Sequence, residues 1–208
     1  MTAVAIPAVG DHHACTVIGL DGELWCWGSN SSGQLGLDPS TTPSALLPTR
    51  IPGMTGVGSV CAADMHTCVT FRSGAVRCWG ANDAGQLGVL PTGPGGYLPV
   101  DAGINGTAVG VSCSQASTCA RMFDGSVQCW GYNDLGQAGN GTFDTPAPPG
   151  PVRGLSGEYA IQVVVGTWFA CAVLDSGGVM CWGFNEDAQL GDESFEHRPG
   201  AVRVRGLR

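Results

Sequence analysis

The chain has 208 residues and a formal net charge of −8, and its nine basic residues are all arginine. An acidic surface repels phosphate backbones, so this balance argues against DNA or RNA as a partner. Charged residues make up only 12% of the chain, whereas glycine occurs 34 times and proline 13 times. This composition is typical of short strands joined by turns, so the sequence predicts an all-β fold.

The apolar runs of the chain are short, as in Val163-Val164-Val165, and none is long enough to span a bilayer. The first residues, Met1 to Pro7, include neither a basic leader nor a proper apolar stretch. If a secretory signal existed, we expect that it was removed ahead of this sequence.

A fixed period organises the chain. The tripeptide Cys-Trp-Gly occurs four times, and the residue numbers of its successive tryptophans differ by 52, 51 and 52. Each copy continues with Asn-x-x-Gly-Gln-Leu-Gly, except that Ala138 replaces the leucine in the third copy and Ala188 replaces the first glycine in the fourth. Such a period is the mark of a repeat architecture. We therefore expect a single domain over residues 1–208, built of repeats 9–56, 57–108, 109–160 and 161–208.

Each repeat has another cysteine ten or eleven residues before the cysteine of Cys-Trp-Gly, and turn-forming residues lie between the two cysteines. Alternating residues flank these turns, which predicts a β-hairpin in every repeat. A proline-rich loop then leads to one more short strand, at residues 98–100, 151–153 and 201–204 in the later repeats. Three or four strands in about 51 residues are the content of one propeller blade. The four turns are Asp21-Gly22, Ser73-Gly74, Asp124-Gly125 and Ser176-Gly177-Gly178.

The combined pattern, His-Thr-Cys…Asp-Gly-x-Val-x-Cys-Trp-Gly-x-Asn-x-x-Gly-Gln-Leu-Gly, resembles the regulator of chromosome condensation repeat, and especially its cysteine-bearing bacterial versions. The resemblance extends from about Val9 to Leu207. It implies a β-propeller with one repeat in each blade. The family includes nucleotide exchange factors for a small nuclear GTPase and bacterial inhibitors of β-lactamase, so no single activity follows from the fold.

Well-known members of that family carry seven repeats, whereas this chain has four. We expect either a closed four-blade ring or an open arc that a partner completes, with a homodimer as one way to complete it. In an open arc, we expect the end blades to expose apolar faces near Val17 and Leu24 in the first repeat and near Val173 and Val179 in the last.

The paired cysteines of the four hairpins predict disulfides, because residues placed symmetrically about a hairpin turn face each other at bridging distance. Reduced thiols and a metal site are the alternatives, but no Cys-x-x-Cys occurs. Disulfides place the protein in an oxidising compartment: extracellular, periplasmic or at the cell surface. Cys61 and Cys113 remain, either as a bridge between blades or as two buried free thiols. The hairpin pairs are Cys15 with Cys26, Cys68 with Cys78, Cys119 with Cys129, and Cys171 with Cys181.

The sequence predicts a non-enzymatic protein without a cofactor or a metal. No nucleophile elbow, phosphate-binding loop or zinc-protease motif occurs in it. Candidates for a general base are His12, His13, His66 and His197, and for His13 and His66 a structural hydrogen bond is the expected role. We expect the repeated tryptophans to pack between blades and the unrepeated Trp25 to face solvent or a partner.

The longest and most variable segments follow Gly-Gln-Leu-Gly, at residues 37–50, 89–100, 140–152 and 192–202. Stiff loops that carry aromatic side chains suit a recognition surface, because they lose little entropy on binding. We therefore predict protein–protein recognition through loops on one face, by an unidentified protein partner. The alternatives are lectin-like binding of sugars or a purely structural role in a cell envelope. The predicted binding residues are Tyr97, Phe143, Phe195 and Trp168.

Overall fold

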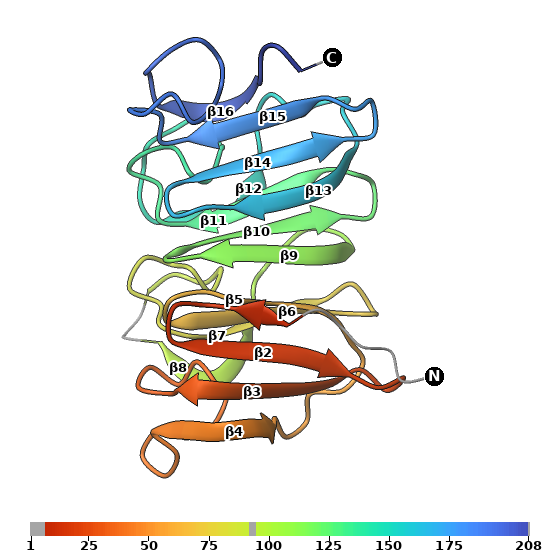
Figure 1. The fold of residues 1–208 in the computed structure, drawn as a ribbon, viewed down its shortest axis with the longest axis vertical. Helices are drawn as coiled ribbons and strands as arrows, with labels where there is room; N and C mark the ends of the chain where they lie inside the picture. The colour runs from red at the N-terminus through yellow and green to blue at the C-terminus, as the bar shows by residue number, and fades with distance from the viewer. Residues whose placement is uncertain (1–6, 92–94, 208) are drawn as a thin grey trace.

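The computed structural model describes residues 7–91 and 95–207, which fold into four antiparallel sheets of four strands each (Figure 1). Every sheet is a simple meander in which each strand pairs with the next one along the chain. No helix occurs in these residues. The strands are β1 (Ala8–Val9), β2 (His13–Ile18), β3 (Glu23–Ser29), β4 (Ser44–Arg50), β5 (Val57–Ala62), β6 (His66–Phe71), β7 (Val76–Gly80), β8 (Gly96–Asp101), β9 (Ala108–Ser114), β10 (Ser117–Met122), β11 (Val127–Gly131), β12 (Ala147–Pro151), β13 (Ala160–Val165), β14 (Phe169–Leu174), β15 (Val179–Gly183) and β16 (Arg198–Arg203).

The four sheets are blades that each contain one sequence repeat, and the predicted hairpins are their two middle strands. In the second blade β6 pairs with β7 so that Cys68 lies directly opposite Cys78. The predicted outer strands at 98–100 and 201–204 fall within or next to β8 and β16. The outer strand predicted at 151–153 differs from the observed one. Strand β12 ends at Pro151, and the next residue, Val152, is buried in the core.

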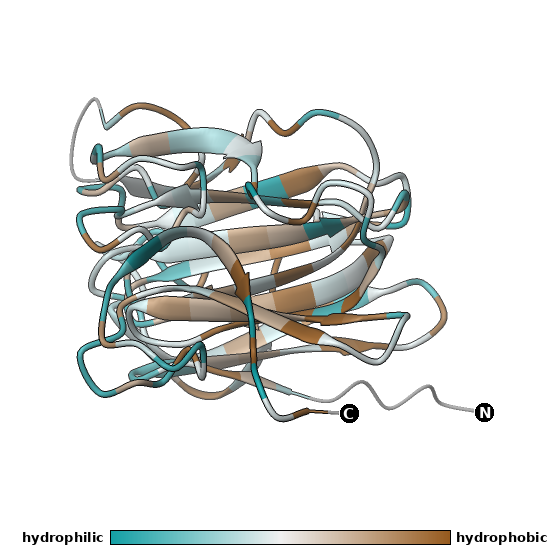
Figure 2. Ribbon diagram, turned by 90° about the horizontal axis from the view of Figure 1, so that it is seen from above, coloured by the Kyte–Doolittle hydropathy of each residue, from teal (hydrophilic) through white to brown (hydrophobic). Residues whose placement is uncertain are grey.

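The blades pack side by side in chain order and form an open arc. Strands β1 and β2 pack on β5, β5 and β6 pack on β9, and β9 and β10 pack on β13. No comparable packing joins the first blade to the fourth within residues 7–91 and 95–207. The structure therefore shows the open arc and not a closed four-blade ring. Seen from above, hydrophobic residues are concentrated along the strands and hydrophilic ones in the loops at both edges (Figure 2).

Each of the three seams between blades is held by a tryptophan of Cys-Trp-Gly. Its indole N–H donates a hydrogen bond to the backbone carbonyl of the Gly-Gln-Leu-Gly glutamine in the preceding blade. These three tryptophans are fully buried, and each belongs to one of the three hydrophobic clusters of the core. The predicted packing of the repeated tryptophans between blades is thus observed for three of the four. The bonds are Trp79 to Gln34, Trp130 to Gln86 and Trp182 to Gln137, each 2.9 Å.

The repeated asparagine and glutamine shape the turn that presents this carbonyl. In the first blade, the side-chain oxygen of Asn30 accepts a hydrogen bond from the N–H of Leu35, at 2.9 Å. The side-chain oxygen of Gln34 accepts one from the N–H of Ser32, also at 2.9 Å. The same pair of bonds recurs in the other three blades. The repeat therefore specifies in every blade a preformed turn that presents this carbonyl, which we call the acceptor turn.

The ten cysteines lie in five disulfides, and no described cysteine is free. Four disulfides join the predicted hairpin pairs, with Cα atoms 4.1 Å apart. The fifth joins Cys61 to Cys113, from β5 to β9 across the second seam. Of the two possibilities that the sequence left open for this pair, the structure has the bridge. Five disulfides indicate an oxidising environment.

Mass spectrometry tests the redox state directly. The intact protein exported through an oxidising pathway is expected to weigh less than the fully reduced chain by one hydrogen for each of its ten cysteines. Peptide mapping without reductant is expected to recover Cys61 and Cys113 in one linked peptide pair. A mass equal to that of ten free thiols would contradict the pairing.

The two ends of the arc are apolar, but the prediction for the first blade was wrong about which face is free. Val17 and Leu24 are buried in the first seam, facing the second blade. Because strand residues alternate, the free face of β2 and β3 instead carries Ile18, Trp25 and Trp27, which are partly exposed. At the other end the prediction agrees with the structure, because the cross-strand pair Val173 and Val179 is only half-buried.

Candidate functional site

The meander topology gives the arc two different faces. One, which we call the loop face, carries the turns between the first and second strands of the blades and the loops after Cys-Trp-Gly. The other, the hairpin face, carries the hairpin turns and the linkers between blades. On the loop face, backbone hydrogen bonds of 2.8–2.9 Å tie each turn to the loop of the same blade: Ser29 N to His12 O, Ala81 N to Met65 O, Tyr132 N to Ala116 O, and Phe184 N to Trp168 O. All four long loops are therefore at one edge of the sheets, at the left in Figure 1.

The loop face has an aromatic hollow of about 300 Å³ between the third and fourth blades. Trp168 lies at its rim, 42% exposed, and packs edge-on against Phe184 with 5.6 Å between ring centroids. Phe184 in turn lies 5.1 Å from the ring of His197, which steadies the tryptophan from behind. The residues that line the aromatic hollow are Gln115, Ala116, Ser117, Tyr132, Leu135, Thr167 and Trp168.

Of the four predicted binding residues, only Trp168 lines this hollow. Tyr97 is half-buried and lines a separate hollow of about 440 Å³ together with Asn82 and Leu87. Phe143 and Phe195 are 47% and 71% exposed in their loops and line neither hollow. The structure thus places all four on the loop face without bringing them into one site.

Tyr132 and Gln115 are parts of the aromatic hollow that the sequence did not reveal. Tyr132 directly follows Cys-Trp-Gly, at a position where the other repeats have Ser29, Ala81 and Phe184. A large aromatic residue at a variable position beside an invariant motif was the available signal. Gln115 has a backbone φ of 41° in the turn between β9 and β10, and nothing in its sequence context predicts that conformation.

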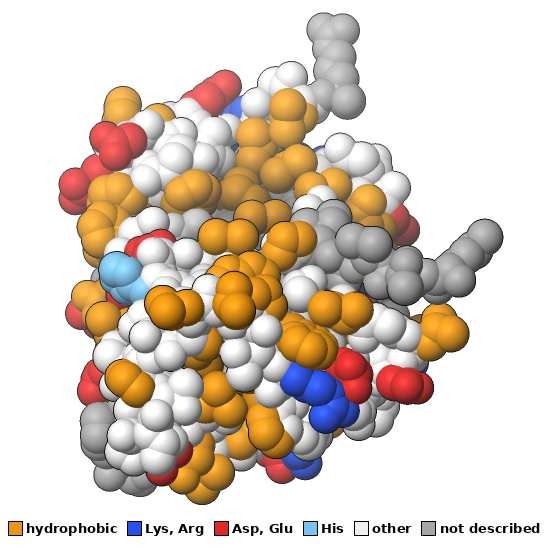
Figure 3. Space-filling model, turned by 60° about the horizontal axis from the view of Figure 1, so that its bottom comes forward, with side chains coloured by type: hydrophobic (Ala, Val, Ile, Leu, Met, Phe, Trp, Pro, Cys, Tyr) orange, Lys and Arg blue, Asp and Glu red, His pale blue; other side chains and the backbone are white. Residues whose placement is uncertain are grey.

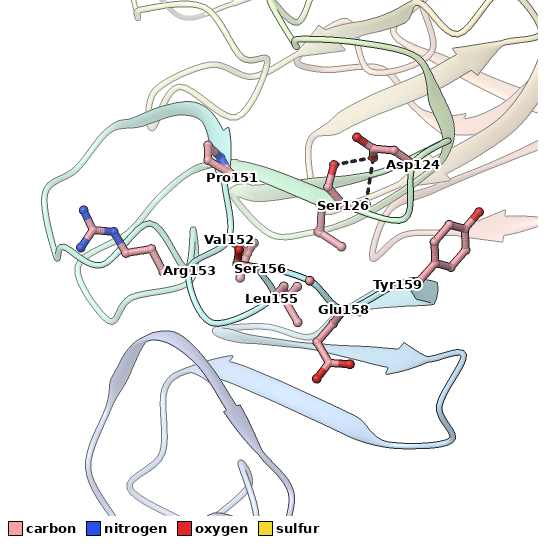
Figure 4. A pocket seen from close by; sticks show the side chains of 11 residues that line it. Asp124, Ser126, Pro151, Val152, Arg153, Leu155, Ser156, Glu158 and Tyr159 are labelled. Atoms are coloured by element: carbon pink, nitrogen blue, oxygen red, sulfur yellow. Dashed lines mark hydrogen bonds between the residues drawn. The ribbon is translucent and has the colours of Figure 1, made fainter.

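A larger pocket, of about 640 Å³, opens on the hairpin face between the hairpin turn of the third blade and the linker that leads to the fourth (Figure 4). Its charged side chains either form hydrogen bonds within the protein or point away from one another. Asp124 accepts hydrogen bonds from the hydroxyl and the N–H of Ser126, at 2.7 and 3.0 Å, and these bonds hold the pKa of its carboxyl below the usual value. Arg153 extends away from Asp124 and Glu158 in Figure 4. This pocket therefore lacks a convergent set of polar groups.

The buried histidines have structural roles. The Nε2 atom of His13 lies 2.7 Å from the hydroxyl oxygen of Thr67, whose single proton is donated to the carbonyl of Gln34, also at 2.7 Å. His13 is therefore the donor to Thr67. The same series of hydrogen bonds occurs at the second seam, where Nε2 of His66 lies 2.9 Å from Oγ1 of Thr118 and Thr118 donates to the carbonyl of Gln86. Both rings reinforce the acceptor turns of the seams, as the sequence predicted, and neither faces a pocket with a nucleophile.

Burial disfavours the charged form of both rings and lowers the pKa of His66 to about 3 and that of His13 to about 4. The positive charge of a neighbouring histidine, His13 for His66 and His12 for His13, contributes in the same direction. For His66, a backbone hydrogen bond with Gln115 partly opposes the shift. Both rings are consequently neutral in the folded protein over the physiological pH range.

This predicts a loss of stability in mild acid. The unfolded chain takes up a proton on each histidine near pH 6.5, whereas the folded chain does so only near pH 3 to 4. The stability is therefore complete above pH 6.5 and falls with decreasing pH, by about 2 kcal/mol per histidine at pH 5. Urea unfolding of the wild type and of His66→Gln at pH 7.5 and pH 5 measures this. The variant is expected to lose about 2 kcal/mol less than the wild type between the two pH values, and an equal loss would contradict the assignment.

The described residues contain no group of three or more His, Cys, Asp or Glu side chains arranged to hold a metal ion. Within the same residues there is also no helix of the length and apolarity needed to cross a membrane.

Four-stranded meanders that pack in chain order around one side of an axis define a β-propeller repeat protein. The sequence profile of the regulator of chromosome condensation (RCC1) repeat matches residues 21–70 and 124–173, and a second profile of the same description matches residues 108–137 and 160–189. Together these matches cover more than half of the chain. The chain belongs to the RCC1 repeat family.

The chain is similar to parts of longer proteins. Human HERC3, a probable E3 ubiquitin-protein ligase, is 32% identical over 88% of this chain and 18% of its own length. The Ultraviolet-B receptor UVR8 of Arabidopsis thaliana is 28% identical over 95% of this chain and 45% of its own length. The structure of Prp20p from Saccharomyces cerevisiae, at 18% identity, shares the fold with a TM-score of 0.81 over 97% of this chain and 50% of that one. The chain thus spans less than half the length of these two curated relatives.

Proposed function

We propose that this chain is a non-enzymatic scaffold for protein–protein recognition through its loop face. The observation that carries the proposal is the aromatic hollow, where Trp168 is exposed yet held in place by Phe184. A rigid, partly exposed aromatic side chain beside a hollow is the common form of an anchor point at protein interfaces. A relative of the same fold supports the proposal, because the structure of Prp20p was reported with its binding properties to Gsp1p and histones.

We place this recognition outside the cytoplasm. Ten cysteines, all paired, would be unstable as disulfides in a reducing cytosol, and all five bridges tie hairpins or seams of the core. An extracellular, periplasmic or cell-surface location is therefore the setting in which this fold is stable.

The loop face can be tested with a triple variant, Phe143→Ala, Phe195→Ala and Trp168→Ala. Because the three side chains are 42–71% exposed, the free energy of unfolding is expected to fall by only about 1–2 kcal/mol. Proteins captured from an extracytoplasmic extract by the wild type and by the variant are compared by quantitative mass spectrometry. The proposal predicts that a defined set of captured proteins is lost with the variant.

Phe123→Ala provides the matched control. Phe123 is 71% exposed, the same fraction as Phe195, but it lies beside a hairpin turn on the opposite face. Its replacement is expected to leave the captured set unchanged. Equal losses for the control and the triple variant would show nonspecific adhesion, and a large drop in melting temperature for the triple variant would show that its side chains belong to the core.

Sugar binding is the second candidate function, and the composition of the aromatic hollow favours it. Trp168 and Tyr132 offer ring faces, and Gln115 and Thr167 offer polar groups, within one hollow of a size that suits a small ring. Binding of the purified chain to a glycan array, abolished by Trp168→Ala, would support this function over protein recognition. A chain that captures neither proteins nor glycans would support the purely structural role.

We also propose that a second copy of the chain covers the open ends of the arc. Both end sheets expose apolar side chains, and isolated apolar faces of this kind usually find a partner.

A further inference from the structure

Each end of the arc carries one half of the hydrogen bond that joins the blades. At the first end, Trp27 is only partly buried, and its indole N–H has no acceptor within the residues described. At the other end, no donor within those residues reaches the backbone carbonyl of Gln189. The three equivalent glutamines, Gln34, Gln86 and Gln137, are at most 5% exposed, whereas Gln189 is only partly buried. The chain thus presents an unused donor and an unused acceptor of the same bond.

The acceptor turn of the fourth blade is already formed. The side-chain oxygen of Asn185 accepts a hydrogen bond from the N–H of Leu190 at 2.9 Å, and that of Gln189 accepts one from Asp187 at 3.0 Å. These are the bonds that shape the turns at the three internal seams. Because the turn keeps this geometry without a neighbouring blade, the carbonyl of Gln189 needs no rearrangement to accept an indole N–H.

The surroundings of the two unused groups are apolar. Beside Trp27, the free face of the first blade exposes Ile18, at 40%, and part of Trp25. Near Gln189, the free face of the fourth blade exposes Val164, at 51%, and the half-buried pair Val173 and Val179. At the internal seams the same positions are filled by buried residues, such as Val17 and Leu24 in the first. Figure 3 shows hydrophobic side chains gathered in a band through the middle of the face that it draws.

We propose that two copies of this chain join head to tail, with the Trp27 face of each copy packed on the Gln189 face of the other, in a ring of eight blades. This deepens the proposal that a second copy covers the open ends, and it does not depend on the loop face. Two different surfaces that meet head to tail form a closed ring when the rotations that relate successive copies add up to a full turn. Two copies of the arc contain about as many residues as one chain of Prp20p, of which this arc matches 50%.

One residue makes the new joint differ from the internal seams. At Gly33, Gly85 and Gly136 a Cβ atom would lie 2.7–2.9 Å from an atom at the start of the next blade's outer strand or in the residue just before it. The fourth blade has Ala188 at the same position, exposed, with φ of +58°. Its methyl group holds the outer edges of the two blades slightly further apart than at an internal seam. The joint is therefore expected to be weaker than those seams, and Ala188→Gly is expected to strengthen it.

Analytical ultracentrifugation of the full chain over a wide range of concentrations tests the proposal. A species of twice 21.2 kDa is expected to form as the concentration rises, with no larger species. Trp27→Phe keeps an aromatic ring but removes the indole donor, so that the carbonyl of Gln189 is buried without a partner. The dissociation constant is then expected to rise by roughly tenfold or more, and Ala188→Gly is expected to lower it.

Trp25→Phe is the matched control. Trp25 lies on the same face, but no residue at its position donates to the glutamine carbonyl at an internal seam: Gln128 bonds to the backbone of Asn105 instead, and Arg77 bonds to Asp101 in its own blade. Its replacement is therefore expected to change the dissociation constant far less than Trp27→Phe does. A dimer whose dissociation constant does not change with Trp27→Phe would contradict the proposed contact between the Trp27 face and the Gln189 face, although a second copy would remain the partner. A chain that stays monomeric at every concentration would overturn both, and a series of ever larger species would overturn the ring. None of these results bears on capture by the loop face.

Discussion

Replacing Trp130 with alanine is expected to lower the free energy of unfolding by about 3–5 kcal/mol, the usual loss for a fully buried large aromatic side chain. Trp130 is completely buried in the second seam, where its indole donates to the carbonyl of Gln86 at 2.9 Å. The substitution removes the side chain that fills the space between two blades, and Gln86 keeps only the hydroxyl of Thr118 as a donor, at 3.1 Å. Urea unfolding, followed by circular dichroism, measures the loss.

Trp27→Ala is the matched control, since it changes the same position of the same motif in the first blade, which packs on no preceding blade among the described residues. Trp27 is only partly buried and donates no hydrogen bond within the described part of the chain. At a dilution where the chain is monomeric, the loss is expected to be less than half that of Trp130→Ala. Equal losses would show that the seams do not account for the stabilising role of the repeated tryptophan.

The blade could be predicted from the sequence because its signals are local. Two cysteines placed symmetrically about a turn, such as Cys68 and Cys78 around Ser73-Gly74, fix the register of a hairpin, and the structure has that register. The number of blades follows from the period in the same way. The bridge from Cys61 to Cys113 was only one of two possibilities, because it depends on which blades are neighbours and on the faces that they turn toward each other.

The direction in which each blade faces could not be predicted, and this is why Val17 and Leu24 were assigned to the free face of the first blade, whereas they lie in the first seam. Alternation along a strand separates residues into two faces but does not say which face meets the next blade. The tryptophan of Cys-Trp-Gly carries that information only once Trp79 is seen bonded to Gln34 of the preceding blade. The aromatic hollow escaped prediction for a related reason, since Tyr132 and Trp168 come from different blades and meet only across a seam.

Removing the bridge between blades is expected to destabilise the protein more than removing a bridge within a hairpin. Cys61 and Cys113 are 52 residues apart, and Cys68 and Cys78 are 10 apart. In the chain-entropy description, closing these loops in the unfolded state is worth about 4 and about 3 kcal/mol respectively. The double variant Cys61→Ala, Cys113→Ala is therefore expected to lose about 1 kcal/mol more than Cys68→Ala, Cys78→Ala.

The two double variants are also expected to differ in where the native structure opens. Cys61 and Cys113 join the inner strands β5 and β9, so without them no covalent link holds the second seam, which keeps only side-chain packing and hydrogen bonds such as those of Trp130, Thr118 and Val111. Hydrogen exchange is expected to rise along β9 and in the acceptor turn of the second blade, around Gln86, while the hairpin of β6 and β7 stays protected. The hairpin variant is expected to show the reverse, with faster exchange confined to β6 and β7. If both variants instead exchange uniformly over the whole chain, the arc unfolds as one cooperative unit, and the seams are not the places where it first opens.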